Sequence, residues 1–325
     1  MTVASELLTI ERQHHAGSFS AIRQPVLSIE PGTGTRIAFE TNDASFQQMD
    51  EFRDIKKVTA TRNAVTGPVY VEGAEPGDVL AVTVHHIQTA EQGWSVYIPG
   101  AGALAKPMGD ELWVRRVPLR DGYAYLTDQV RLPIQTMIGC IGVAPAEGEA
   151  NTIIPCFRTG GNFDVPDIKP GATLYLPVEV EGALLSLGDL HAAMARGESS
   201  FIGIETAGVA TVSIDLIKSF ELGAPRIDTG DEIICIGLGD PLRESIRAAY
   251  ESLFDYLVVE RGWDRHDAYI VMSAAAHTEL GGPVGSEQPD PLHPLRAVGA
   301  ITVARLDKAL ADVHATRAPW GRARV

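Results

Sequence analysis

Three polar residues interrupt an apolar stretch near the middle of the chain. Residues 182–187 have the composition of a buried strand, and Asp189 and His191 follow on the same face of that strand because side chains alternate with a period of two. Glu198 comes next, after a short turn closed by Gly197. A carboxylate and an imidazole that converge at a strand end can hold a divalent metal or act as an acid–base pair.

This pattern leaves three interpretations open. With a metal, an open coordination position would activate water for hydrolysis. Without one, Asp189 would orient His191, or Glu198 would take a proton from water. The structural alternative is a simple Asp–His hydrogen bond at a strand end. Glu205 lies further on, at the end of another apolar run.

A glycine-rich loop lies upstream of this stretch. Gly160 and Gly161 precede Asn162, and Asp164 follows two residues later. Paired glycines let backbone N–H groups approach a small substrate, and the Asn162 amide can both donate to and accept from a carboxamide. The alternative is an ordinary Asx turn.

Five other residues have side chains capable of chemistry or recognition. Asp43, taken alone, indicates a helix cap or a turn after a strand. His85 and His86 are neighbours in a predicted strand, so one is expected inside and the other in solvent. Trp94 could form an apolar wall. Cys140 lies among aliphatic residues with no base nearby in sequence, so water is the preferred nucleophile over its thiol.

Proline–glycine pairs predict that strands surround these residues. Proline presets the φ of one turn position, and glycine accepts the positive φ of the next. Three such pairs precede alternating runs of β-type residues, at positions 35–40, 79–87 and 173–180. Short strands separated by many turns are typical of a sandwich or a barrel.

Helices are expected mainly near the C-terminus. Asp240 followed by Pro241 indicates a helix start, and the apolar positions from 246 to 257 have helical spacing. Asp264 is the expected cap of a second helix. Residues 297–306 have the pattern of a strand, and the arginine-rich tail, residues 316–325, is expected to be a mobile end or an oligomer contact.

The predicted fold class is therefore mainly β, sandwich-like or barrel-like, with a few C-terminal helices, and α+β as a whole. We expect two β-rich subdomains that pack intimately as one unit. The first comprises residues 1–150, and the second, residues 151–325, carries the main site motifs and the helices.

Composition restricts the partners and the compartment. A formal charge of −15 disfavours binding to the phosphate backbone of nucleic acids. The three cysteines show no metal-site or disulfide spacing, which favours a reducing compartment. Neither a signal peptide nor an apolar run of membrane-spanning length is evident. We expect a cytoplasmic protein that binds neither nucleic acid nor membrane.

Several motifs in order give the chain a resemblance to a known family. It resembles the acetamidase/formamidase family over most of its length. The motifs that carry the resemblance lie at residues 41–44, 63–78, 93–94, 141–145, 160–164, 169–178, 181–183 and 188–193.

The resemblance implies an amidohydrolase. Such an enzyme cleaves the linear C–N bond of a short carboxamide, such as formamide or acetamide, and releases a carboxylate and ammonia. It also implies a mostly β architecture and a homo-oligomer.

The residue types then suggest a role for each residue in the reaction. A divalent metal, with zinc preferred, would polarise the amide oxygen and water, and Glu198 or Glu205 would take and return the proton beside His191. Trp94, Asp164, Asn162 and the backbone of Gly160 and Gly161 would hold the amide. The expected metal ligands are Asp43, Asp189, His191 and Glu198.

The chain departs from the family pattern at two places. Residues 156–159 precede the glycine-rich loop where the family usually has a histidine, and residues 194–198 replace a glutamine followed by Gly-Asp-Gly-Glu. Both changes touch the rim of the pocket, so the resemblance fixes the reaction class better than the substrate. The alternatives are a hydrolase of a ureido or cyclic amide bond and a non-catalytic protein that binds a metabolite or serves as a scaffold.

Overall fold

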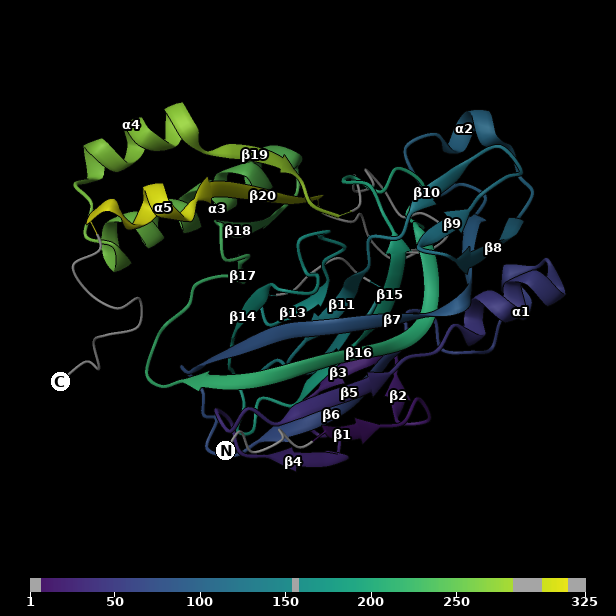
Figure 1. The fold of residues 1–325 in the computed structure, drawn as a ribbon, viewed down its shortest axis with the longest axis horizontal. Coiled ribbons are helices and arrows are strands. Elements are labelled where there is room, and N and C mark those ends of the chain that lie inside the picture. Colours follow the sequence, from purple (N-terminus) through teal and green to yellow (C-terminus); the bar gives the residue numbers. More distant parts are fainter. Residues whose placement is uncertain (1–6, 154–157, 283–299, 315–325) are drawn as a thin grey trace.

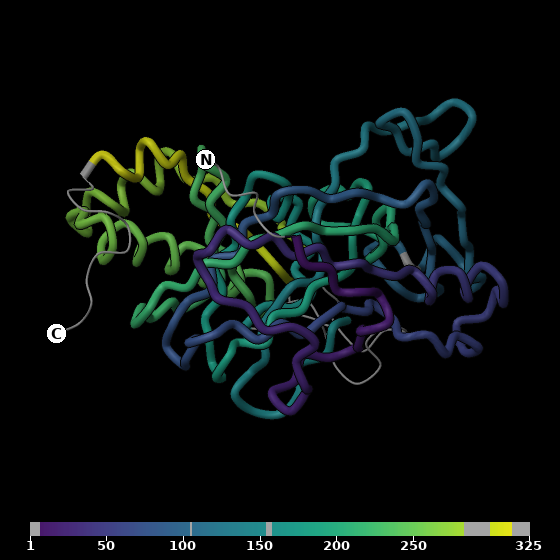
Figure 2. The backbone as a smooth tube through the Cα atoms, turned by 60° about the horizontal axis from the view of Figure 1, so that its bottom comes forward, coloured from purple at the N-terminus to yellow at the C-terminus, as the bar shows by residue number. Residues whose placement is uncertain are grey.

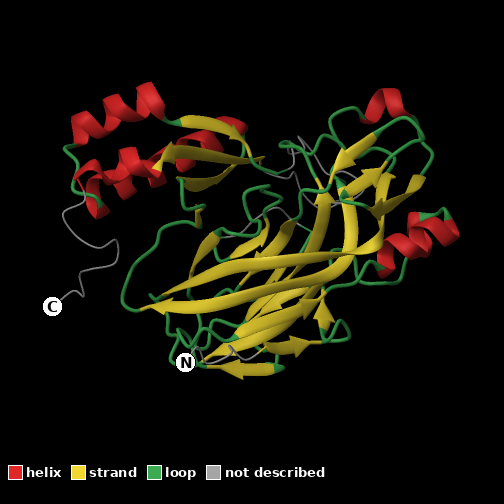
Figure 3. Ribbon diagram, in the orientation of Figure 1, coloured by secondary structure: helices red, strands yellow, loops and turns green. Residues whose placement is uncertain are grey.

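The computed structural model describes residues 7–153, 158–282 and 300–314 (Figure 1). The described strands form one hydrogen-bonded network of 18 strands and a separate pair, β3 (Ser18–Ser20) with β12 (Glu149–Asn151). The largest group of helices is formed by the C-terminal part of the chain (Figure 3). The mainly β fold with C-terminal helices is therefore confirmed.

Two long antiparallel strands organise the first group of strands. This group consists of β1 (Leu7–Ile10), β5 (Arg36–Glu40), β7 (Val79–Tyr97), β8 (Trp113–Arg120), β14 (Thr173–Pro177) and β16 (Ile204–Ile217). Strands β7 and β16 pair from Val79 with Ile217 to Trp94 with Glu205. One end of β7 also pairs with β14 and the other with β8, while β5 pairs with β16.

The second group of strands is built around β15. It consists of β2 (His15–Ala16), β4 (Leu27–Ile29), β6 (Val65–Val71), β11 (Met137–Gly142), β13 (Gly160–Asn162) and β15 (Leu185–Ala193). Strand β15 pairs with β6 and β11. Its last residues also pair with the first residues of β16. This pairing is a seam that joins the two groups.

Both groups contribute side chains to one hydrophobic core. Phe39, Val82 and Val212 come from the first group, and Leu185 and Leu187 from the second, and all are almost completely buried in the same cluster. Because apolar residues alternate along each strand, the opposite face remains available for polar residues. At the seam between β15 and β16 the strand pairing is irregular, with a register shift between His191 and Ala193.

The C-terminal part of the chain forms a lobe of helices and strands. Its elements are β17 (Arg226–Asp228), β18 (Glu232–Gly239), α3 (Leu242–Asp255), the π-helix η2 (Tyr256–Glu260), α4 (Arg265–Ala275), β19 (His277–Leu280), β20 (Ala300–Asp307), α5 (Lys308–Ala311) and η3 (Asp312–His314). A second core around Leu253, Trp263 and Leu306 joins the helices to the strands. Within it, the buried Arg226 guanidinium donates two hydrogen bonds to Glu260. This pairing satisfies a charge that would otherwise be costly to bury.

The remaining described elements are α1 (Ala44–Phe52), η1 (Ile55–Lys57), α2 (Ala105–Met108), β9 (Tyr123–Tyr125) and β10 (Arg131–Pro133). Strands β8 to β10 and helix α2 extend from the body at the end opposite to the C-terminal lobe (Figure 2). None of the described helices combines the length and apolarity needed to cross a membrane.

Most strand and helix predictions agree with the structure. The three proline–glycine turns precede β5, β7 and β14, and the Asp264 carboxylate accepts hydrogen bonds from the N–H groups of His266 and Asp267 at the start of α4. The predicted role of Asp240 is wrong. Helix α3 begins at Leu242, and Pro241 occupies the N-cap position, where it has no side-chain acceptor to offer.

Three predictions concern the ends and the division of the chain. Strand β20 begins at Ala300, while residues 297–299 and the arginine-rich tail, residues 316–325, lie outside the described residues. Strands from both predicted subdomains pair directly, as β7 does with β14 and β16. The boundary at residue 150 itself stays a prediction.

Candidate active site

The hairpin of β15 and β16 brings four polar residues together. His191 on β15 pairs with Glu205 on β16 across the seam, and Asp189 lies two residues before His191. Glu198 belongs to the connecting turn, in which its N–H donates to the carbonyl of Ala195 over 3.1 Å. A segment of 17 residues therefore supplies three carboxylates and one imidazole.

A fifth polar residue, Asp164, comes from the turn after β13. The N–H groups of Phe163 and Asp164 both donate to the carbonyl of Gly139, over 2.9 and 3.1 Å. Gly139 is on β11, which pairs with β15. This turn therefore holds Asp164 against the strand that carries Asp189 and His191.

These five residues form a compact carboxylate–histidine cluster. Nε2 of His191 lies 3.0 Å from Oε1 of Glu205, 3.4 Å from Oε1 of Glu198 and 3.8 Å from Oδ1 of Asp164. His191, Asp164, Glu198 and Glu205 are at most 6% exposed, and Asp189 is half-buried. Such a concentration of buried acidic groups is costly unless it serves a function or holds a cation.

The backbone around the cluster is unusual. Asp164, Asp189 and Glu198 have φ angles of 46°, 58° and 31°, in the left-handed region that side chains other than glycine rarely adopt. Each such residue costs on the order of 1–3 kcal/mol, and residues of this kind gather at functional sites. The positive φ of Asp189 also shows that regular strand alternation does not explain its position.

Two glycines make room for the cluster. A Cβ atom on Gly139 would lie 2.5 Å from both Oδ1 of Asp164 and Oδ2 of Asp189. A Cβ atom on Gly203 would lie 2.7 Å from Cδ2 of His191. Our sequence interpretation missed both glycines, although an isolated glycine inside a strand pattern often marks such a close approach.

Burial and mutual repulsion change the proton affinities of the cluster. Burial raises the pKa of Asp164 and of Asp189 well above the usual range, and Glu198 adds to the first shift and Glu205 to the second. Burial also raises the pKa of Glu198, although His191 opposes this shift. Burial acts to lower the pKa of His191, but Glu205 and Glu198 outweigh it and raise that pKa well above 6.5. The cluster therefore attracts positive charge.

The donor set fits a divalent cation. Two overlapping groups, Asp164–Asp189–His191 and His191–Glu198–Glu205, each place three ligand atoms within 4.8 Å of one another. Oδ1 of Asp164 and Oε2 of Glu198 are buried without a hydrogen-bond partner. Oxygen and imidazole ligands of this kind suit zinc and other divalent ions.

The glycine-rich loop has a clear structural role. Gly160 pairs with Gly142 on β11, and a Cβ atom on Gly160 would lie only 2.4 Å from the Cα of Gly142. The Asn162 side chain accepts a hydrogen bond from Asn63 over 2.9 Å and donates to the carbonyl of Ile153 over 3.4 Å. These contacts hold β13 against its neighbours. The amide-binding role of Gly160, Gly161 and Asn162 stays a prediction.

Asp43 lies apart from the cluster, next to Trp94. It occupies the N-cap position of α1, and its Oδ2 accepts a hydrogen bond from Nε1 of Trp94 over 2.5 Å. Its Oδ1 accepts from Nε2 of Gln47 over 2.7 Å. Among the described residues, Asp43 belongs to neither group of potential metal ligands. Its link to the cluster is indirect, since Trp94 pairs with Glu205 across β7 and β16.

Comparison with known proteins decides the family. The sequence model of the acetamidase/formamidase family matches residues 11–148 and 142–225. This chain belongs to the acetamidase/formamidase family. The predicted resemblance is thus confirmed, and the matched residues include all five members of the carboxylate–histidine cluster.

Curated relatives of the family are moderately similar to the chain. A putative formamidase of Schizosaccharomyces pombe is 28% identical over 255 residues, and an acetamidase of Mycolicibacterium smegmatis is 29% identical over 256 residues. Both alignments cover 59% of this chain. They span only 61% and 63% of the two relatives' own lengths.

A solved structure extends the similarity to the whole fold. The crystal structure of a predicted acetamidase/formamidase from Thermoanaerobacter tengcongensis superimposes with a TM-score of 0.86 at 29% identity. The superposition covers 97% of this chain and 100% of that one. The C-terminal lobe is therefore part of the architecture that the two family members share.

Cys140, His85 and His86 do not belong to the carboxylate–histidine cluster. Cys140 is completely buried, and burial, followed by Asp189 and Asp164, raises the pKa of its thiol well above the usual range. His85 is half-buried beside Ser213, and His86 is exposed. Cys156 lies outside the described residues. Among the described residues, the burial of Cys140 and the raised pKa of its thiol favour water over this thiol as the nucleophile.

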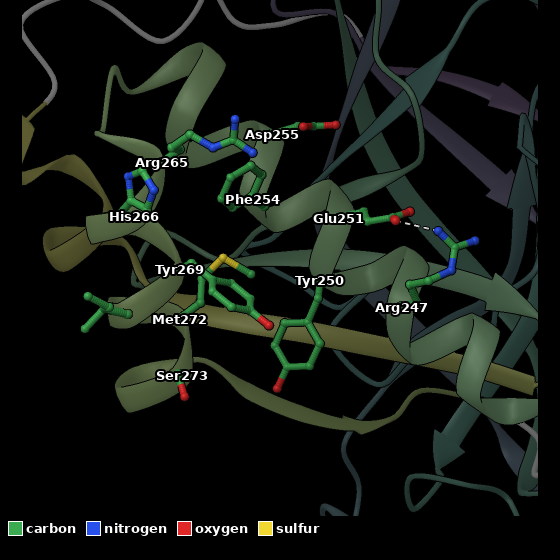
Figure 4. A pocket seen from close by; sticks show the side chains of 11 residues that line it. Arg247, Tyr250, Glu251, Phe254, Asp255, Arg265, His266, Tyr269, Met272 and Ser273 are labelled. Atoms are coloured by element: carbon green, nitrogen blue, oxygen red, sulfur yellow. Dashed lines mark hydrogen bonds and ion pairs between the residues drawn. The ribbon is translucent and has the colours of Figure 1, made fainter.

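A groove on the C-terminal lobe offers a contrasting surface. It lies between α3 and α4, encloses about 1190 Å³ and is lined by Tyr250, Phe254, Tyr269 and Met272 with charged residues at its edge (Figure 4). Neither group of potential metal ligands among the described residues lies in it. The carboxylate–histidine cluster is therefore the better candidate for an active site of this family member.

Proposed function

We propose that this chain hydrolyses the C–N bond of a short linear carboxamide, releasing a carboxylate and ammonia. Membership of the acetamidase/formamidase family supports the reaction class. The observation that carries the proposal is the position of His191 Nε2, within 3.0 to 3.8 Å of three buried carboxylates. Amide hydrolysis needs an activated water and a group that shuttles protons, and carboxylates beside an imidazole are suited to both tasks.

We propose that a divalent cation, with zinc preferred, completes the site. Asp164, Asp189 and His191 would hold it, because their ligand atoms lie within 4.8 Å of one another. Such an ion supplies Lewis acidity, which polarises the amide oxygen and lowers the pKa of water. The unpartnered Oδ1 of Asp164 and the raised carboxyl pKa values support a cation at this position.

Glu198 is the proposed general base. Its Oε1 lies 3.4 Å from His191, while its Oε2 is buried and has no partner. Burial raises its pKa toward the range in which a carboxylate exchanges protons efficiently. It would take a proton from water and return it to the leaving amine.

Glu205 has a supporting role in this scheme. Its Oε1 accepts the N–H of Gly203 over 3.0 Å and lies 3.0 Å from Nε2 of His191. These contacts fix the Glu205 carboxylate beside the imidazole. Glu205 would therefore keep the ring oriented as a ligand of the proposed cation.

A panel of amides with an ammonia readout tests this function. The purified chain should release ammonia from at least one short linear amide, and exhaustive chelation followed by zinc should abolish and then restore that release. Ureido compounds and cyclic amides belong in the same panel, because activity on them alone would mean that the linear-amide proposal is wrong. If the purified protein contains the metal but releases ammonia from none of the compounds, a binding or scaffold protein would be favoured.

A further inference from the structure

Arg196 stands two residues before Glu198 and connects three parts of the chain. Its Nη2 donates to Oδ2 of Asp167 over 2.6 Å, and its Nε lies 2.9 Å from Oε2 of Glu279 on β19. Asp167 is 4% exposed and follows Asp164 by three residues. One guanidinium therefore joins the Glu198 turn, the Asp164 turn and the C-terminal lobe.

We infer that Arg196 is a positioning residue that fixes Glu198 relative to Asp164 and His191 through its ion pairs with Asp167 and Glu279. The planar guanidinium can bind two carboxylates in a fixed geometry, which a flexible side chain with a point charge cannot match. This inference rests on the proposed role of Glu198 as the general base. It adds a residue that does not itself touch the reacting atoms.

The other contacts of the Glu198 turn include backbone hydrogen bonds. The N–H of Phe201 donates to the carbonyl of Glu198, and the N–H of Ala103 donates to the carbonyl of Ser199, both over 2.8 Å. The N–H of Gly197 reaches the carbonyl of Gly281 only over 3.4 Å, and Gly197 and Glu198 both have positive φ angles. A turn with these backbone angles needs surrounding contacts to hold it in place. Arg196 adds ion pairs to these backbone contacts, and its side chain is 25% exposed while its partner Asp167 is nearly buried.

The Asp164 turn has a second, independent tie. Arg305 on β20 lies 3.5 Å from Oδ1 of Asp167 and donates to Glu279 over 3.0 Å, and it also pairs with Glu232. Loss of the Arg196 side chain would therefore leave Asp167 and the adjacent Asp164 turn attached to the lobe. The Glu198 turn would lose its ion pairs with Asp167 and Glu279 and keep only its backbone hydrogen bonds.

Because Arg305 still holds the Asp164 turn, loss of Arg196 should affect the Glu198 turn more than the Asp164 turn. In an Arg196→Met protein, the Glu198 carboxylate should move away from His191 by about 1 Å or more, while Asp164 should keep its position. Because a misplacement of about 1 Å can lower a rate by about 10²-fold, kcat should fall by that factor. KM and the zinc affinity should change little, since the proposed cation ligands and their ties remain.

Crystal structures and kinetics of matched variants test the inference. Arg196→Met should separate Oε1 of Glu198 from Nε2 of His191, and Arg196→Lys should recover part of both the contact and kcat. The control is Arg247→Met, because Arg247 also pairs with two carboxylates, Glu244 and Glu251, on the exposed face of α3. Its kcat should stay at the parental value.

Two outcomes would overturn the inference. One is an Arg196→Met structure in which Glu198 keeps its 3.4 Å contact with His191. The other is an equal loss of kcat in Arg247→Met.

A second variant is available if Arg196→Met does not fold. Glu279→Gln weakens the ion pair between Arg196 and Glu279 from the more exposed side, and it should displace Glu198 to a smaller extent. A Glu198→Gln protein with parental kcat would instead refute the proposed base, while the structural comparison would still decide the role of Arg196.

Discussion

Gly139 on β11 faces Asp189 on β15 so closely that a single added carbon would occupy the space of the carboxylate. The flanking pairs, Ile138 with Leu190 and Cys140 with Gly188, fix the two residues opposite each other. A Cβ atom on Gly139 would lie 2.5 Å from Oδ2 of Asp189. The cluster thus depends on the absence of a side chain as much as on the acidic residues themselves.

The Gly139→Ala substitution should therefore disable the site without unfolding the protein. The new methyl group must displace Asp164, Asp189 or His191, whose Cε1 would be 2.8 Å away. Ammonia release should fall by about 10²-fold, as expected for a displacement of about 1 Å. Gly223→Ala is the matched control, since no atom lies within 4 Å of a Cβ there. Parental activity in Gly139→Ala would show that hydrolysis does not depend on the positions of Asp164, Asp189 and His191.

Asp43→Asn should leave the cation content of the protein unchanged. The oxygen of an asparagine can still accept the Trp94 hydrogen bond, and Asp43 lies outside both groups of potential ligands among the described residues. Asp189→Asn should lower the zinc affinity by about 10-fold or more, because it removes a charged ligand. Metal analysis of the two variants after dialysis distinguishes these roles. A similar loss of zinc from both variants would support Asp43 as a metal ligand.

Cys140→Ala should retain the ability to release ammonia. The thiol is fully buried, and its raised pKa keeps it protonated at neutral pH, so it is a poor nucleophile. The substitution should lower the free energy of unfolding by about 1 kcal/mol, because it removes a buried sulfur atom and its weak hydrogen bond to Thr152. Ammonia release and urea denaturation measure the two effects. A folded variant that lost all activity would indicate a thiol mechanism.

The metal-free protein should lose stability as the pH rises above 6.5. The pKa of His191 is raised in the folded state, so its protonation stabilises the fold below 6.5, and that contribution disappears as the pH passes the folded-state pKa. The raised pKa values of Asp164 and Asp189 act in the same direction, because their ionisation disfavours the folded state, and their contribution begins to fall at a lower pH, near the ordinary carboxyl pKa of about 4. The melting temperature of the chelated protein should therefore decrease from pH 6.5 upward. Saturating zinc should reduce the decrease, and an identical pH profile with and without zinc would contradict the cation proposal.

The sequence was sufficient to predict the strand-rich fold and part of the cluster. Proline–glycine turns before β5, β7 and β14 are local signals, and so is the polar end of the strand that carries His191. The pairing of His191 with Glu205 is a matter of strand register across the seam, which depends on the packing of the whole core.

Asp164 illustrates what local sequence could not provide. Its place after the glycine-rich loop predicts amide binding, which stays a prediction, and gives no sign that it lies 3.8 Å from His191. Two hydrogen bonds to the carbonyl of Gly139 determine that position. For Asp43, the spacing in a polar motif gives no information about its distance from the other acids, and its role as a metal ligand stays a prediction.

The most direct test of the central claim is the rate of ammonia release by Glu198→Gln and His191→Ala proteins that are shown to be folded. The substrate is the best amide of the panel, and Gly223→Ala serves as the control. If the cluster performs the hydrolysis, Glu198→Gln should lose about 10²- to 10⁴-fold in kcat, as expected for removal of a general base, and His191→Ala should lose both zinc and activity. Parental rates in both variants would contradict the account.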